Sequence, residues 1–149
     1  MITNGAPLFP VTILLVEDNP GDIELTKEAL AETKVLTNLH TVENGLEALD
    51  FLFKRGNYSN APRPDIIILD LNLPLKDGRK VLEIVKEDIN LRRIPVVILS
   101  SSKAEQDILR SYNLHANCYI TKPLDFSQFS QVVKTIEQFW FTVVKLPPY

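Results

Sequence analysis

The sequence predicts an α/β protein built on an open, doubly wound parallel sheet of five strands with helices on both faces. Short apolar runs of strand length alternate along the chain with segments of helical spacing, and right-handed crossovers between parallel strands carry such helices to both faces of a sheet. The runs at residues 66–69 and 96–99 are apolar at every position, which is typical of strands buried on both faces. The 149 residues, 45% of them hydrophobic, suit one domain.

Five strands are expected, of which the second is the weakest. They cover residues 12–16, 38–42, 65–69, 95–99 and 117–121. Apolar residues at three- and four-residue steps predict five helices that follow these strands in turn. The first four cover residues 23–31, 46–53, 81–85 and 108–114. The fifth begins near Asp125 and repeats apolar residues at Phe126, Phe129, Val132, Val133, Ile136 and Trp140.

Further features concern the organisation and the location of the chain. Residues 55–64 are rich in Gly, Asn, Ser and Pro and are expected to form a surface loop, because the alternating pattern continues on both sides of them. No apolar stretch approaches the roughly 18 residues of a membrane span, and the first ten residues lack the pattern of a signal peptide. The single cysteine, Cys118, excludes an intramolecular disulfide and favours a reduced compartment and a packing role. We therefore expect a cytoplasmic protein.

The charge balance argues against a nucleic-acid partner or a membrane surface. The net charge is −3, and no run of Lys or Arg occurs. The chain thus lacks the basic footprint that binds phosphate backbones or anionic lipids. Its function has to come from local chemistry.

Polar side chains gather where the expected strands end. The residues that follow the first, third, fourth and fifth strands include Glu17, Asp18, Asp70, Ser100 and Lys122. The carboxyl ends of parallel strands share one edge of the sheet, which is where ligands of such folds bind. Taken alone, residues 17–21 also fit a turn in which Asn or Asp caps the first helix, and Lys122 alone also fits a solvated lysine.

Three carboxylates at one edge call for a cation. Crowded carboxylates repel each other, which destabilises the fold unless a cation neutralises them. Mg²⁺ prefers oxygen ligands and uses one or two carboxylates together with substrate phosphate oxygens. The two histidines, His40 and His115, are far apart in the sequence and form no cluster of the kind that binds zinc. Both are expected to be surface residues or satisfied structural residues.

A carboxylate beside Mg²⁺ is suited to phosphoryl transfer. Asp70 is the central member of the group and the candidate nucleophile, which would form an aspartyl phosphate. Lys122, fixed by the following Pro123, is the candidate ammonium that neutralises the transferring group. Ser100 is the candidate hydroxyl that donates to a phosphoryl oxygen.

Four motifs now resemble those of the receiver domains of two-component response regulators. They are VEDN at 16–19, DLNLPLKDG at 70–78, VVILSSS at 96–102 and YITKP at 119–123. Their order and spacing match the family over about residues 11–141, and together they are highly specific. The resemblance implies a flavodoxin-like (βα)5 fold with strand order 2-1-3-4-5, and a phosphoacceptor that catalyses only its own phosphorylation and dephosphorylation.

The resemblance also assigns roles to single residues. It implies that Asp70 is the phosphoacceptor and that Mg²⁺ is held by Asp18, Asp70 and the backbone carbonyl of Asn72, with Glu17 assisting through water. It further implies these roles: a switch hydroxyl on Ser100, an aromatic switch at Tyr119, a phosphoryl partner in Lys122, a cis peptide before Pro123, and lifetime tuning by Asn72 and Ser102. Two departures, Ser100 in place of the commoner Thr and a turn at residues 115–118 without the usual glycine, do not threaten the chemistry.

A narrower resemblance concerns residues 16–30, VEDNPGDIELTKEAL, together with the long loop before the third strand. Both are similar to the small stand-alone regulators that serve bacterial phytochromes, the Rcp type of cyanobacteria. This similarity implies that the phosphodonor is a phytochrome histidine kinase and that the signal is red or far-red light.

Phosphorylation would draw Ser100 toward the phosphoryl group and let the Tyr119 ring enter the vacated space. Because an aromatic ring has only a few rotamers, this response is discrete and not graded.

The end of the chain leaves room for no output domain after the fifth helix, so we expect a single receiver domain over 1–149 with a short N-terminal arm and an aromatic C-terminal extension. Its output would be contact with an unknown downstream protein. Phe139, Trp140 and Phe141 are consecutive, and one helix face cannot bury three successive residues. A homodimer interface formed by these aromatics is favoured; the alternative is a tail packed on its own domain.

Three other functions remain open at this stage. A Mg²⁺-dependent phosphohydrolase of the haloacid-dehalogenase type also uses an Asp nucleophile, but it normally has a second acid two residues later, where this chain has Asn72. A receiver that works only as a phosphorylation-independent binding module is disfavoured by the complete set of site residues. FMN binding is disfavoured because Glu17 and Asp18 would repel its phosphate.

Overall fold

The computed structural model describes residues 10–31, 36–100, 118–121 and 127 of the chain. Within these ranges five strands alternate with three α-helices and one short 3₁₀ helix. The elements are β1 (Val11–Val16), α1 (Pro20–Ala31), β2 (Thr37–Val42), α2 (Gly45–Phe53), η1 (Gly56–Tyr58), β3 (Ile66–Asp70), α3 (Gly78–Glu87), β4 (Val96–Ser100) and β5 (Cys118–Thr121). The helices expected at 108–114 and from Asp125 onward lie outside the described residues, apart from Ser127, which is helical.

The strands form one parallel sheet in the order β2-β1-β3-β4-β5. This confirms the expected fold class and strand order. The chain moves outward from β1 to β2 and then returns to place β3 on the other side of β1. The carboxyl ends of β1 and β3 therefore flank the point where the winding reverses, the usual ligand-binding position in such sheets.

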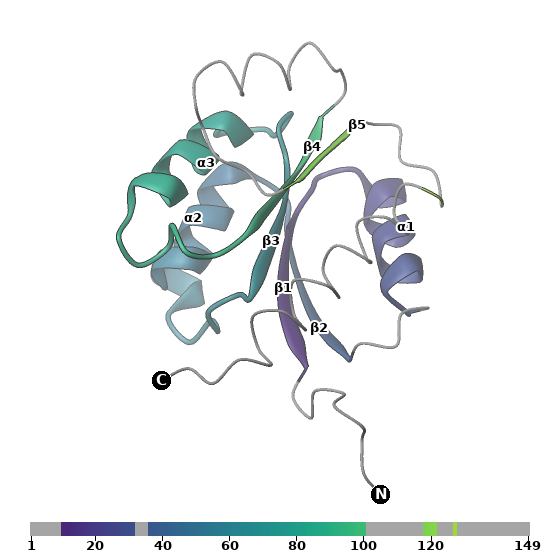
Figure 1. Cartoon of the computed structure of the whole chain (residues 1–149). Helices are drawn as coiled ribbons and strands as arrows, with labels where there is room; N and C mark the ends of the chain where they lie inside the picture. Colours follow the sequence, from purple (N-terminus) through teal and green to yellow (C-terminus); the bar gives the residue numbers. More distant parts are fainter. Residues whose placement is uncertain (1–9, 32–35, 101–117, 122–126, 128–149) are drawn as a thin grey trace, which may run out of the picture.

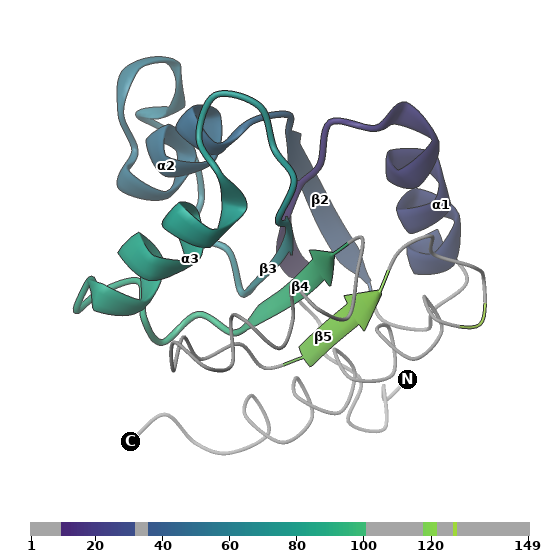
Figure 2. The same ribbon diagram turned by 90° about the horizontal axis from the view of Figure 1, so that it is seen from above.

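Helices cover both faces of the sheet, with α1 on one face and α2 and α3 together on the other (Figures 1 and 2). Successive strand residues point to opposite faces. Leu14 and Val16 accordingly belong to the cluster under α2 and α3, whereas Ile13 and Leu15 belong to the cluster that also contains Ala29 of α1. This two-sided burial explains why the strands are apolar at nearly every position.

Polar caps define where the helices begin. Asn19 Oδ1 accepts a 3.0 Å hydrogen bond from the Asp22 N–H, and α1 starts at Pro20, three residues before the apolar pattern begins. Proline suits this first position because its missing N–H would have no partner there. Asn44 caps α2 by accepting from Glu47 N at 2.8 Å and donates from Nδ2 to the Glu47 side chain at 3.0 Å. The first of these bonds satisfies a backbone N–H that the helix end would otherwise leave without a partner.

The segment expected as a surface loop at residues 55–64 contains the 3₁₀ helix η1 and is attached to α2. The Tyr58 ring lies 5.6 Å from that of Phe51, centroid to centroid. Its hydroxyl donates a 3.1 Å hydrogen bond to Glu47 Oε1. A single aromatic side chain thus ties the loop to the helix.

His40 differs from its expected role as a surface or satisfied residue. Its ring packs 5.4 Å from that of Phe51, and its buried Nε2 has no hydrogen-bond partner among the described residues. The physical reason is that this face of the edge strand β2 packs against α2, which places the imidazole on apolar atoms. His40 is a packing residue.

Candidate functional site

The carboxyl end of β1 supplies two acidic residues with different surroundings. The Glu17 N–H donates a 3.0 Å hydrogen bond to the Val42 carbonyl, which extends the pairing of β1 with β2. The Glu17 side chain is fully buried, and its Oε2 accepts from the Asn19 N–H at 3.2 Å. Asp18 is exposed. The turn therefore serves two purposes at once, since Asn19 caps α1 while Glu17 and Asp18 face the edge of the sheet.

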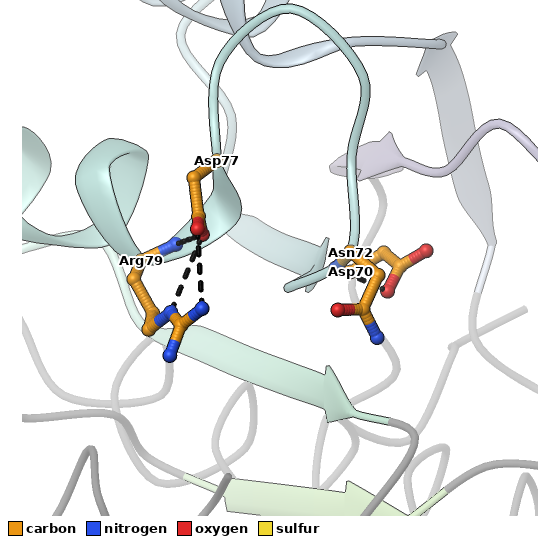
Figure 3. A network of polar contacts seen from close by, with 4 residues as sticks. All are labelled: Asp70, Asn72, Asp77 and Arg79. Atoms are coloured by element: carbon orange, nitrogen blue, oxygen red, sulfur yellow. Dashed lines mark hydrogen bonds and ion pairs between the residues drawn. The ribbon is translucent and has the colours of Figure 1, made fainter.

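The carboxyl end of β3 supplies the central acid. Asp70 is the last residue of β3, paired with Leu99 of β4, and it is only 1% exposed. Its Oδ1 accepts a 3.0 Å hydrogen bond from the Asn72 N–H (Figure 3). The side chain of Asn72 is exposed. The strand was expected to end one residue earlier, at Leu69, because the apolar run stops there, but the backbone pairing continues through the polar residue.

Glu17, Asp18 and Asp70 form one acidic cluster. One carboxylate oxygen from each lies within 4.8 Å of the other two. Two of the three residues are buried, so water can offset their mutual repulsion only in part. An all-oxygen set of this spacing suits a hard divalent cation such as Mg²⁺ or Mn²⁺. The residues present fit the expected metal.

The loop after Asp70 packs closely against two glycines, Gly78 and Gly45. A Cβ added to Gly78 would lie 2.6 Å from Leu71 Cα and would also meet the Asp70 carbonyl oxygen. A Cβ added to Gly45 would lie 2.7 Å from Lys76 Cβ. Both contacts leave no room for a larger residue. Sequence reasoning missed them, because they join segments whose separation in space a pattern does not reveal.

A second polar group in this loop is separate from the acidic cluster. Asp77 caps α3 by accepting from Arg79 N at 2.8 Å, and its carboxylate lies 3.2 Å from the Arg79 guanidinium. Figure 3 shows the Arg79 side chain turned toward Asp77 and away from Asp70. Because of this cap α3 begins at Gly78 and runs to Glu87, longer than the expected 81–85.

The structure brings some of the other expected site residues to the same edge. Ser100 is the last residue of β4 and pairs with Thr121 of β5, one step beyond the pairing of Asp70 with Leu99. Tyr119 lies on β5 opposite Ile98, is half-buried, and packs against the cluster under α2 and α3. The remaining expected residues lie outside the described ranges: Ser102, Lys122, Pro123, Phe139, Trp140 and Phe141.

A comparison with protein families identifies the family of the chain. The model of the response regulator receiver domain matches residues 13–134. The chain belongs to the response regulator receiver family. This receiver domain therefore carries its acidic cluster at the edge that the resemblance indicated, and the family is not one of enzymes in the usual sense.

Individual relatives cover almost the whole receiver. Response regulator Rcp1 of Synechocystis sp. (strain ATCC 27184 / PCC 6803 / Kazusa) is 46% identical over 138 residues, which is 93% of this chain and 94% of Rcp1. The crystal structure of the phosphorylated cyanobacterial phytochrome response regulator RcpA is 52% identical, covers 95% of this chain and 100% of RcpA, and has a TM-score of 0.79. The Mn²⁺-bound form of Rcp1 is 46% identical, covers 93% of this chain and 99% of Rcp1, and has a TM-score of 0.78.

In the described part of the receiver, no helix combines the length and the apolar character needed to cross a bilayer.

Proposed function

We propose that this receiver accepts a phosphoryl group on Asp70 from the phosphohistidine of a histidine kinase. The observation that carries the proposal is the arrangement of Asp70 itself. Its carboxylate is almost fully buried at the end of a central strand, is oriented by the Asn72 N–H, and lies beside Glu17 and Asp18. A structural acid would gain nothing from two further acids at this distance.

The chemistry is a displacement at phosphorus. A carboxylate oxygen of Asp70 forms the new P–O bond, the P–N bond of the phosphohistidine breaks, and the imidazole leaves with the bonding electron pair. The hydrogen bond from Asn72 N restricts rotation of the carboxylate, so less orientational freedom is lost in the transition state. The product is an acyl phosphate that persists until water attacks it.

The acidic cluster would hold Mg²⁺ through Asp18, Asp70 and the backbone carbonyl of Asn72, with Glu17 acting through water. When bound, the cation neutralises charge on the transferring group and on the carboxylates. Support comes from the oxygen donor set and its spacing, and from Rcp1, which has been crystallised with Mn²⁺. Asp18 is the exposed member and so the one that an incoming cation meets first.

The remaining roles are proposed from the receiver motifs. Lys122 would neutralise the phosphoryl group, Ser100 would donate to it, and Tyr119 would change position in response. Pro123 would follow a cis peptide, and the side chains of Asn72 and Ser102 would tune the lifetime of the acyl phosphate. The half-buried position of Tyr119 on β5 supports its part, because the ring lies between the core and the surface.

The biological setting is proposed from the relatives. RcpA is a phytochrome response regulator, and we propose a phytochrome histidine kinase as the phosphodonor here. The receiver would act in the cytoplasm, through contact with a downstream protein. It would form a homodimer through Phe139, Trp140 and Phe141, which sedimentation equilibrium with and without a phosphoryl mimic would test.

Labelling by a small phosphodonor tests the central claim. Incubation with acetyl phosphate and Mg²⁺, followed by intact-mass analysis, should add one phosphoryl group to the wild type and none to Asp70→Asn. Asp77→Asn is the matched control, since Asp77 lies on the same loop outside the cluster, and it should be labelled like the wild type. Equal labelling of Asp70→Asn would contradict the proposal. So would steady turnover of a phosphate monoester, which indicates a phosphohydrolase.

A further inference from the structure

A cationic furrow lies at the edge of the sheet opposite to Asp70. Two neighbouring depressions of about 330 Å³ and about 510 Å³ share Arg63 and Asn90 as lining residues. One wall comes from the end of α2 and the segment that leads into β3. The other comes from the segment between α3 and β4 (Figure 1). Both segments lead into strands, whereas Asp70 ends one. Because the strands are parallel, the furrow and Asp70 lie at opposite ends of the strands.

Apart from Lys76, on the loop after Asp70, and Lys86, whose Nζ donates to backbone carbonyls, the cations of the described residues form two groups. Lys27, Arg79 and Lys80 each face a carboxylate, and Arg55 faces Asp50 at 3.8 Å. Within the described ranges no hydrogen bond or ion pair engages the side chains of Lys54, Arg63 and Arg93, which line the furrow, or the side chain of their neighbour Arg92. In a chain of net charge −3 this concentration of uncompensated positive charge is a local exception.

The furrow also has an apolar component. Leu52, Phe53 and Leu91 line the smaller depression. Ile89 lines the larger one and is 67% exposed. Leu52 and Leu91 are largely buried and Phe53 is half-buried, so Ile89 supplies most of the exposed apolar surface. Arginine is enriched in interface hot spots. A simple inorganic anion would use only the cations and leave the apolar surface in water.

The walls are held in place before any partner binds. Lys86 Nζ donates to the carbonyls of Arg92 and Ile94 at 3.3 and 3.2 Å, which fastens one wall to α3. Asp88, the acidic residue that lines the furrow, accepts at Oδ1 from the N–H groups of Asn90 and Leu91 at 2.8 and 3.0 Å. The Asp88 carboxylate therefore interacts with backbone N–H groups of the same wall. A surface that is already ordered loses little entropy on binding.

We infer that this furrow binds an acidic peptide segment of a partner protein, with an apolar side chain of that peptide against Phe53, Leu91 and Ile89. The carboxylates of the peptide face Arg63, Arg93 and Lys54. The site is separate from the phosphoacceptor and needs neither Asp70 nor a metal. It gives the receiver an interaction surface at the far end of the sheet.

Fluorescence anisotropy tests the inference with a fluorescein-labelled peptide in which Asp and Glu alternate with Leu and Phe. The acidic peptide should bind the full chain about tenfold or more tightly than its counterpart with Asn and Gln in place of the acids. Added NaCl should weaken the binding. Equal binding of the two peptides would overturn the inference. Binding of single-stranded DNA in place of the peptide would also overturn it, because the site would then recognise polyanions in general.

Charge reversal locates the site. Arg63→Glu/Arg93→Glu should weaken peptide binding by about tenfold or more, whereas Lys27→Glu/Lys80→Glu, with the same change in net charge, should leave it within about twofold. Arg63→Gln/Arg93→Gln provides a milder pair if reversal disturbs folding, and it should give an intermediate loss. Equal affinities of the reversal and control variants would reject the furrow as the site.

A final variant separates this inference from the proposed phosphorylation. Asp70→Asn should bind the acidic peptide like the wild type. In NMR titrations the backbone amides of Arg63, Asn90 and Arg93 should shift, and those of Asp18 and Asn72 should not. Shifts confined to the Asp70 edge would contradict the inference and leave the proposal for Asp70 untouched.

Discussion

The Asn72 N–H donates a 3.0 Å hydrogen bond to Oδ1 of Asp70, so the residue two positions after the strand orients the carboxylate that ends it. The interaction uses the main chain and leaves the Asn72 side chain exposed. Orientation of the proposed phosphoacceptor is therefore a property of the loop backbone.

Removal of that single N–H should slow phosphorylation. Asn72→Pro deletes the donor, and a hydrogen bond to a charged group is worth about 1.5–3 kcal/mol, which corresponds to about a tenfold or larger fall in the labelling rate. Asn72→Ala keeps the N–H and should stay much closer to the wild type. Acetyl-phosphate labelling followed over time by mass spectrometry measures both, with thermal unfolding as a check on folding. Similar rates for the two variants would show that the bond does not matter.

Metal binding should reverse the order of stability between the wild type and a cluster variant. In EDTA, Asp18→Asn should be more stable than the wild type, because it relieves repulsion with Glu17 and Asp70. With Mg²⁺ at about a hundred times its dissociation constant, the wild type should gain about 2.7 kcal/mol and the variant much less. Urea unfolding measures the difference. Glu28→Gln, an exposed acid outside the cluster, is the control and should show no such reversal.

Gly78 should not tolerate even a methyl group. Gly78→Ala would place Cβ 2.6 Å from Leu71 Cα, and overpacking of this kind costs about 1–3 kcal/mol. Gly21→Ala is the matched control in α1, where the nearest atom is the Asn19 side-chain oxygen at 3.2 Å. The better helix propensity of alanine should make that change neutral or stabilising by up to about 1 kcal/mol. Equal free energies of unfolding for the two variants would contradict the close approach.

Leu75 carries backbone strain on the same loop. It has a φ of 68°, which is unfavourable for leucine, and it is 74% exposed, so its side chain buries little apolar surface in return. Leu75→Asn should stabilise the protein by about 1 kcal/mol, because Asn accepts the left-handed region more readily. Leu46 is another exposed leucine, in the first turn of α2, and Leu46→Asn should give no gain. A gain in both would assign the effect to surface hydrophobicity.

Alkaline pH should weaken the attachment of the 55–64 segment. Burial, followed by the hydrogen bond to Glu47, raises the pKa of Tyr58 above its usual value of 10.0. The folded state thus keeps a proton that the unfolded chain loses, so this contribution to stability is present below pH 10.0 and is lost as the pH rises through the folded-state pKa. The stability difference between the wild type and Tyr58→Phe should shrink over that range. Burial lowers the pKa of Lys86 from its usual value of 10.5, but this contribution cancels because both proteins contain it.

The sequence was a good guide wherever the physical cause is local. Two-sided apolar runs predicted buried parallel strands, and polar residues after them predicted the edge that carries Glu17, Asp18 and Asp70. The bounds were less accurate. An apolar run stops at a carboxylate, yet backbone pairing ignores side-chain polarity, so β3 extends through Asp70. For the same reason the polar first turn of α3, capped by Asp77, was not recognised as helix.

Features that depend on distance between segments were beyond the sequence. Gly45 and Lys76 are far apart in the chain, and no periodicity indicates that they touch. The packing of His40 on Phe51 and the attachment of Tyr58 to α2 are of the same kind. The furrow was missed because its cations do not form a run. They come together only when the segments before β3 and β4 fold side by side.

Strand β3 connects the two ends of this receiver and is buried along its whole length. Five strand residues span roughly 15 Å. A phosphoryl group on Asp70 would therefore not contact a peptide bound at Arg63 at the other end. A partner bound through its acidic segment would stay bound in both phosphorylation states. Phosphorylation would then change the contacts of a partner that is already bound and would not be needed to recruit it.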